Sequence, residues 1–193
     1  MSPSLTCNDD RIPFLYEEAY QWYTSFDELG EIIERPNPTP AFRHLDKVID
    51  HLIKDCQWPI NRIHFFGFAQ GGSVGAEFVV RRWKAHSSKG TDHAFASVVS
   101  VSGPLLSYPT HSDLLCPTPL CAAHRLPLAS SLISDFRKAF SPVTETRMIE
   151  KDEGMPASRT EWEPIMRFWS ETLTRRPVDG LYEVKTGASS IHK

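Results

Sequence analysis

The fold is decided by the stretch Asn61-Arg-Ile-His-Phe-Phe-Gly-Phe-Ala-Gln-Gly-Gly-Ser73. Residues 62–66 carry one isoleucine and two phenylalanines, which favours a short β-strand. The glycines within residues 67–72 indicate a tight turn, because glycine adopts backbone conformations that other residues avoid. From Ser73 to Trp83, apolar residues recur with the period of a buried helix. The chain is therefore predicted to run from a strand through a glycine turn into a helix.

The residues before this stretch are predicted to form a connector followed by a surface helix. Residues 35–40 read Arg-Pro-Asn-Pro-Thr-Pro, and so dense a set of prolines makes a rigid connector. We expect Thr39 to cap the next helix and Pro40 to take its first position. Its apolar face, at a period of 3.6 residues, consists of Phe42, Leu45, Ile49, Leu52, Ile53 and Cys56.

The region after it continues the alternation of strands and helices. We expect strands over residues 94–101, 119–123 and 143–149, and helices over residues 132–140 and 158–173. The side chains expected to face inward from the last helix are Trp162, Ile165, Met166, Trp169 and Leu173. This alternation predicts an α/β fold in three layers, a mostly parallel central sheet with helices on both faces.

The composition is that of one globular domain. The chain has 193 residues, of which 40% are hydrophobic and 23% are charged, enough for one sizeable core. A formal net charge of −3 gives no electrostatic reason to expect nucleic acid or an anionic membrane as a partner. No stretch is long and apolar enough for a signal core or a membrane span. We therefore expect a soluble, cytoplasmic protein that is not an integral membrane protein.

No metal or cofactor is expected from the cysteines and histidines. The four cysteines, Cys7, Cys56, Cys116 and Cys121, include no C-x-x-C pair. Cys56 and Cys116 lie in apolar stretches and are predicted to be buried free thiols. His44 and His51 stand two helical turns apart, and the other histidines show no metal-ligand spacing either.

Several motifs resemble acyl-protein thioesterases and their carboxylesterase relatives, the phospholipase/carboxylesterase/thioesterase family. Residues 61–73 are similar to the family segment N-R-I-x-x-x-G-F-S-Q-G-G. Residues 99–103 resemble its strand and L-S-G turn, residues 119–124 its P-x-x-x-x-H-G strand, and residues 153–155 the turn before its histidine. The likeness runs from about Pro40 to Leu173. It implies an α/β-hydrolase fold that lacks the first strands.

In α/β-hydrolases a sharp strand-to-helix turn, G-x-S-x-G, carries the nucleophilic serine above the sheet. Gly67-Phe-Ala-Gln-Gly71 has that frame, between a predicted strand and a predicted helix. The resemblance implies that the backbone N–H of Gln70 would be one oxyanion donor. The residues assigned to this elbow and oxyanion region are Gly67, Phe68, Gln70, Gly71 and Gly72.

The three positions of the catalytic triad hold residues that cannot perform the reaction. By the resemblance, the nucleophile falls on Ala69, the acid on Leu128 and the base on Ala157. A methyl group cannot attack a carbonyl, and neither other residue can orient or accept a proton. Loss of all three groups indicates a lineage that stopped catalysing rather than one engineered Ser→Ala change.

Two other residues remain as alternative participants. Ser73, one turn after Ala69, could replace the nucleophile, although hydrogen bonding at a helix N-terminus is its ordinary role. His124 could act as a base, although a histidine there is structural in the relatives. No His-Gly pair precedes Gly67 to supply the second oxyanion donor, so we expect the chain to begin partway into the fold. An apolar sheet edge left open in this way would favour partner pairing.

The expected organisation is an aromatic-rich segment and connector over residues 1–39, the hydrolase-like domain over 40–175 and a flexible tail over 176–193. The first segment contains a dense group of aromatic residues, Phe14, Tyr16, Tyr20, Trp22, Tyr23 and Phe26. We predict that these rings belong to the core, with a groove for an acyl group or partner as the alternative.

The functional expectation is a pseudoenzyme, a non-catalytic binding or interaction protein with an acyl or ester ligand or a protein partner. The alternative is an active carboxylic-ester or acyl-thioester hydrolase that uses an unconventional nucleophile or a longer parent chain.

Overall fold

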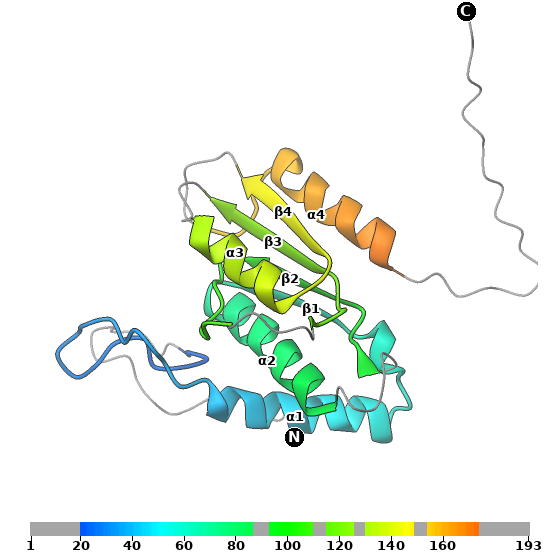
Figure 1. The fold of residues 1–193 in the computed structure, drawn as a ribbon, viewed down its shortest axis with the longest axis horizontal. Coiled ribbons are helices and arrows are strands. Elements are labelled where there is room, and N and C mark those ends of the chain that lie inside the picture. The colour runs from blue at the N-terminus through cyan, green and yellow to red at the C-terminus, as the bar shows by residue number, and fades with distance from the viewer. Residues whose placement is uncertain (1–19, 87–92, 110–114, 126–129, 149–153, 174–193) are drawn as a thin grey trace, which may run out of the picture.

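Four parallel strands form one sheet in the order of the chain (Figure 1). The computed structural model describes residues 20–86, 93–109, 115–125, 130–148 and 154–173. The strands are β1 (His64–Phe68), β2 (Ser97–Val101), β3 (Leu120–Arg125) and β4 (Val143–Met148). Each pairs with the next in parallel, and Phe68 lies level with Val101 and Ala123. The carboxyl ends of the strands therefore meet at one edge.

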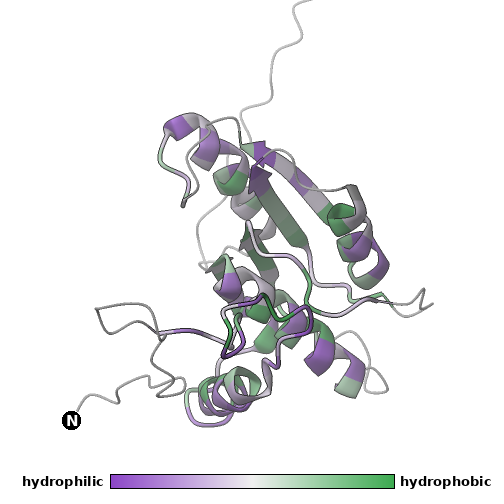
Figure 2. Ribbon diagram, turned by 90° about the vertical axis from the view of Figure 1, so that its left-hand side faces the viewer, coloured by the Kyte–Doolittle hydropathy of each residue, from purple (hydrophilic) through white to green (hydrophobic). Residues whose placement is uncertain are grey.

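Helices cover both faces of this sheet, as predicted. They are α1 (Thr39–Lys54), α2 (Gln70–His86), α3 (Ser130–Ala139) and α4 (Arg159–Thr172), with a short 3-10 helix η1 (Ile60–Arg62) before β1. Side chains of α1, α2 and α3 form one core cluster with one face of the strands, and side chains of α4 form a second cluster with the other face. In Figure 2 green, hydrophobic strands of the centre of the sheet lie between helices whose outer faces are purple.

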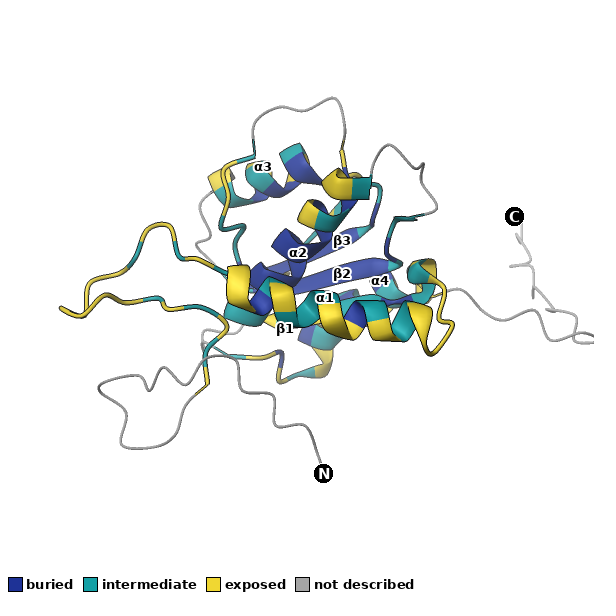
Figure 3. Ribbon diagram, turned by 90° about the horizontal axis from the view of Figure 1, so that it is seen from below, coloured by how far each residue is buried: buried dark blue, intermediate teal, exposed yellow. Residues whose placement is uncertain are grey.

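The central strands are buried along almost their whole length because both faces are covered. All five residues of β2 are buried, and so are the first five of β3. A strand exposed on one face would alternate apolar with polar residues instead. The edge strands β1 and β4 are only partly buried, so the core is centred on β2 and β3 (Figure 3).

Several boundaries differ from the sequence prediction. Pro38, not Thr39, is the N-cap of α1, and the Asn37 side chain accepts a hydrogen bond from the Thr39 N–H at 3.1 Å. Helix α2 begins at Gln70, before Ser73. The start of β1 moves to residue 64 because η1 takes up residues 60–62.

The predicted burial of Cys56 is wrong. Helix α1 ends at Lys54, so the 3.6-residue period no longer places Cys56 on the apolar face, and its side chain is exposed. The inward face of α4 also differs from the prediction. Phe168 is buried, whereas Met166 and Leu173 are 56% and 53% exposed. Glu161 on this helix is buried and accepts a hydrogen bond from Arg125 of β3. This contact sets the rotation of α4 about its own axis.

The predicted core role of the aromatic group is wrong for Tyr20, Trp22 and Phe26, which are exposed. Their segment is an irregular loop with a single antiparallel bridge between Phe26 and Ile32, drawn in blue in Figure 1. The loop passes over the outside of the domain, so these rings cannot enter the interior. Phe14 and Tyr16 lie outside the described residues. Among the helices that the structure describes, none has the length and apolar character needed to cross a membrane.

Candidate functional site

The glycine turn forms a sharp elbow between β1 and α2. Ala69 connects the two elements with a φ angle of 47°, in the left-handed region that alanine rarely adopts. Its N–H donates to the Val101 carbonyl at 2.8 Å, and its carbonyl accepts from the Ser73 N–H at 3.1 Å. These bonds anchor the bend to the end of β2 and to the first turn of α2.

Three glycines allow this bend to pack closely. A Cβ on Gly67 would lie 2.3 Å from the backbone carbon of Gly71, and a Cβ on Gly103 would lie 2.4 Å from the Ala69 carbonyl oxygen. A Cβ on Gly72 would lie 2.5 Å from the Ser100 hydroxyl. No real Cβ tolerates such distances. The elbow therefore has the strand-turn-helix form that presents a nucleophile, but it presents a methyl group.

The loop of residues 22–25 is fastened to the helical side of this elbow by the Gln70 side chain. The Trp22 N–H donates to Gln70 Oε1 at 2.9 Å. Gln70 Nε2 donates to the Tyr23 carbonyl at 3.2 Å and to the Ser25 hydroxyl at 2.7 Å. The Trp22 indole lies 3.4 Å from the position of a Cβ on Gly71. The sequence offered no signal for this contact beyond the density of aromatic residues.

Ser73 is fully buried beneath this cover. Its hydroxyl makes no hydrogen bond of ordinary length within the described part of the chain, so no described histidine could take its proton. The Tyr23 ring lies close by. Burial raises the pKa of Tyr23, and the neighbouring Ser73 hydroxyl opposes this effect only in part. Tyr23 is therefore a neutral phenol at pH 7.

We expect Gln70→Ala to release the loop from the elbow. Loss of the acceptor at Trp22 removes a bond with a net value of about 1 kcal/mol, so amide exchange at Trp22 should quicken about fivefold. Hydrogen exchange resolved at the Trp22 amide measures this. Gln57→Ala is the control, because within the described part of the chain Gln57 donates to the Lys54 carbonyl and not to residues 22–25, so it should leave Trp22 unchanged. Equal exchange in the wild type and Gln70→Ala would show that Gln70 does not hold the loop.

The turn assigned to the catalytic base is held by a buried ion pair. Arg125 Nη1 lies 2.6 Å from Glu161 Oε1, with exposed side-chain fractions of 12% and 2%. Glu161 Oε2 accepts the Ala157 N–H at 3.0 Å, and Arg125 Nη2 donates to the Gly154 carbonyl at 3.4 Å. Ala157 itself is exposed. Sequence reasoning missed this pair, because Arg125 and Glu161 look like ordinary surface charges in the sequence.

His124 lies away from the elbow. It is buried, and its Nε2 lies 3.2 Å from Glu145 Oε1 on the neighbouring strand. Hydrogen bonds from Arg147 and then from His124 hold the pKa of Glu145 below its usual value. Strand β3 is two strands from β1, which separates their backbones by about 10 Å. The structure therefore brings Ala69, Gln70 and Ser73 together without His124, and Leu128 lies outside the described residues.

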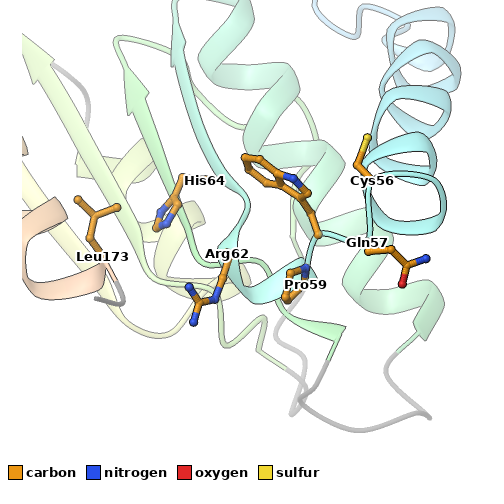
Figure 4. Close-up of a pocket in the computed structure, with 7 residues that line it drawn as sticks. Cys56, Gln57, Pro59, Arg62, His64 and Leu173 are labelled. Carbon is orange, nitrogen blue, oxygen red and sulfur yellow. The ribbon is translucent and has the colours of Figure 1, made fainter. Parts of the chain in front are cut away.

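Two cavities lie on the amino side of the strands, opposite the elbow. One, of about 390 Å³, is lined by residues that include His64, the first residue of β1 (Figure 4). Another, of about 310 Å³, lies between Ile53, Arg82 and His93. In open α/β sheets, ligands usually bind at the carboxyl ends of the strands. Neither cavity is therefore in the usual place for an active site of this fold.

Comparison with known proteins finds a sequence relative of this chain. No family model matches the chain. The chain is 34% identical over 170 residues to an uncharacterized hydrolase of Mycosarcoma maydis, covering 86% of this chain and 63% of that protein. It therefore spans less than two thirds of that relative.

Solved structures with a similar fold include a carboxylesterase and an acyl-protein thioesterase. The Bacillus cereus carboxylesterase has a TM-score of 0.56 at 15% identity, over 79% of this chain and 68% of that one. The Zea mays acyl-protein thioesterase 2 has a TM-score of 0.51 at 15% identity, over 80% and 73%. Together with the parallel sheet and the elbow, these matches show that the chain has an α/β-hydrolase fold, similar to that of a carboxylesterase and an acyl-protein thioesterase, and that it is a sequence relative of an uncharacterized hydrolase.

Proposed function

We propose that this chain uses a hydrolase scaffold for binding rather than for catalysis. The observation that carries the proposal is Ala69, which occupies the bend of an intact elbow and holds a left-handed φ angle there. That conformation costs about 1–2 kcal/mol for an alanine. In an active hydrolase the same strain serves to present a hydroxyl group.

The surroundings of the elbow support the same conclusion. Ser73 has no described base beside it, and His124 is engaged with Glu145. Tyr23 and Trp22 cover the start of α2. A substitute nucleophile at Ser73 would need both a partner that accepts its proton and access for a substrate, and the described contacts supply neither.

The partner that we favour is another polypeptide that adds a strand beside β1. Strand β1 ends the sheet, and among the described residues it pairs only with β2. Its Phe66 and Phe68 are 39% and 38% exposed, and Phe66 stacks on Trp162 of α4 with ring centres 5.8 Å apart. An unpaired edge with exposed aromatic residues is a template for an added strand.

The second candidate is an active ester or thioester hydrolase with an unconventional nucleophile or a longer parent chain. The close packing at Gly67, Gly72 and Gly103 favours it, because that packing is what an active elbow requires. The two candidates differ in whether the chain reacts with a serine-hydrolase probe.

We expect the wild-type chain to show no labelling by a fluorophosphonate probe and no turnover of short p-nitrophenyl esters. Ala69→Ser alone should also stay inert, because removing one triad member already abolishes most of the rate. The triple variant Ala69→Ser, Leu128→Asp and Ala157→His tests the positions assigned to the triad. We expect the probe to label this variant, and not variants that carry only one or two of the three substitutions. Intact-protein mass spectrometry measures the label, and circular dichroism checks the fold.

Labelling of the wild type that disappears in Ser73→Ala would overturn the binding proposal in favour of the active hydrolase. The matched control is Ser134→Ala, on an exposed position of α3, which should not change any labelling.

A further inference from the structure

A thiol, an imidazole and a carboxylate stand in a row at the carboxyl end of α1. Cys56 Sγ lies 3.7 Å from His51 Nε2, and His51 Nδ1 lies 2.6 Å from Asp55 Oδ2. The backbone N–H groups of Asp55 and Cys56 both donate to the His51 carbonyl, at 2.9 and 3.1 Å. The same turn of backbone therefore fixes all three residues relative to one another.

This order of groups suits removal of a proton from the thiol. When Nδ1 donates to Asp55, Nε2 is the ring nitrogen that faces the Cys56 thiol and can accept its proton. The thiolate is the nucleophilic form of cysteine. The arrangement does not suit a metal ion, because the thiol and the carboxylate lie against different nitrogens of the ring and do not converge on one point.

Cys56 is also the accessible cysteine among those that the structure describes. Cys116 and Cys121 are buried, and burial raises the pKa of both thiols, which keeps them protonated. The Cys56 side chain is exposed. Reagents in solution therefore reach Cys56 and not the two buried thiols.

Cys56 also lies at the cavity of about 390 Å³ opposite the elbow (Figure 4). Arg62 lines the cavity, and the lining residues that the structure describes include no aspartate or glutamate. Burial lowers the pKa of His64, which disfavours a second positive charge in the cavity, and its Nδ1 lies 2.7 Å from the Ser97 hydroxyl. The carboxylate of the array, Asp55, lies against the other nitrogen of the His51 ring from Cys56, so the guanidinium is the charge that faces the cavity and favours an anionic ligand.

We propose that Cys56, with His51 and Asp55, is a thiol-exchange site for small disulfides that carry carboxylates. His51 takes the proton of the Cys56 thiol, and the thiolate attacks one sulfur of the disulfide. The bond between the two ligand sulfurs breaks as the Cys56–sulfur bond forms, and the second half of the disulfide leaves as a thiolate. Disulfide exchange needs a thiolate and access, whereas an ester would also need donors for an oxyanion.

The first experiment measures mixed-disulfide formation on the folded full-length chain. The wild-type reference and all variants carry Cys7→Ser, because Cys7 lies outside the described residues and an adduct on its thiol would add to the signal from Cys56. 3,3′-Dithiodipropionate is added in excess, and intact and peptide mass spectrometry follow the adduct at Cys56. Each rate constant is divided by the rate constant for the reaction of the same disulfide with 2-mercaptoethanol, which corrects for the reactivity of the disulfide itself. His51→Gln should slow the reaction about tenfold, less than for a base in an enclosed site, because the array is exposed.

Lys54→Gln is the matched control, since it removes an exposed cation from the last turn of α1 and leaves the array intact. It should change the rate by less than about twofold. A Cys56 that reacts no faster than 2-mercaptoethanol, or that reacts equally fast in the wild type and His51→Gln, would overturn the role of the array.

The second experiment tests the charge of the ligand. Dithiodipropionate is compared with the neutral 2-hydroxyethyl disulfide and with the cationic cystamine. Arg62→Gln should cut the relative rate of the dianion about threefold and leave the neutral disulfide unchanged. An equal effect of Arg62→Gln on all three disulfides would overturn the proposed preference for carboxylates. Cys56→Ser, which should abolish the adduct, confirms the site.

Discussion

Gly67→Ala is expected to destabilise the protein by about 3 kcal/mol or more, a large part of the 5–15 kcal/mol that holds a typical domain folded. The added methyl group would lie 2.3 Å from both the carbon and the oxygen of Gly71 and 2.5 Å from the Gly72 nitrogen. These are backbone atoms of the elbow and of the first turn of α2, so no side chain can rotate away. Relief requires β1 and α2 to separate. Urea unfolding followed by circular dichroism measures the loss.

Gly75→Ala is the matched control within the same helix. A Cβ on Gly75 would lie 3.9 Å from the Phe65 side chain, an ordinary contact. Alanine is also about 1 kcal/mol more favourable than glycine inside a helix, so this variant should be as stable as the wild type or more stable. Equal unfolding midpoints for Gly67→Ala and Gly75→Ala would mean that the strand and the helix do not approach as closely as the structure shows.

Arg125→Met is expected to cost about 3–5 kcal/mol, because it leaves the carboxylate of Glu161 buried without its cation. Glu161 is 2% exposed, so water cannot replace the guanidinium. The same variant should loosen the turn of Gly154 and Ala157, since Arg125 donates to the Gly154 carbonyl and Glu161 accepts from the Ala157 N–H. Urea unfolding gives the stability, and amide exchange at Ala157 gives the local effect.

Two further variants separate this effect from a general loss of charge. Arg167→Met breaks the exposed pair with Glu163 on the same helix, with side chains 68% and 58% exposed, and should cost less than about 0.5 kcal/mol. The double variant Arg125→Met with Glu161→Leu removes both charges and should be more stable than Arg125→Met alone. A double variant no more stable than the single one would show that loss of the Arg125 charge beside the Glu161 carboxylate is not the source of the lower stability.

Both residues belong to the framework of the candidate site. Gly67 allows the elbow to form, and the Arg125–Glu161 pair holds the turn that the resemblance assigns to the catalytic base. If the chain is a binding protein, these framework residues maintain shape, and their loss should reduce stability without exposing any hidden hydrolytic activity.

Part of the candidate site could be predicted from the sequence, and part could not. The strand, turn and helix around Ala69 were predictable because spacing between near neighbours carries that information: apolar residues at a helical period and glycines at a bend. The burial of Cys56 was predicted wrongly, because a periodic pattern does not say where α1 stops. The contact of Gln70 with residues 22–25 joins positions more than 40 apart, which local pattern cannot relate.

The succession of strands and helices and the lack of a hydroxyl group at position 69 follow from the sequence, since they are properties of neighbouring residues or of one side chain. The tertiary structure alone decided the order of the strands, the rotation of α4 that buries Glu161 against Arg125, and the cover of the elbow by Trp22 and Tyr23. These features depend on which surfaces of the helices, strands and loops come into contact when the chain folds. A buried charge or a side-chain hydrogen bond is decided by partners that are distant in the sequence.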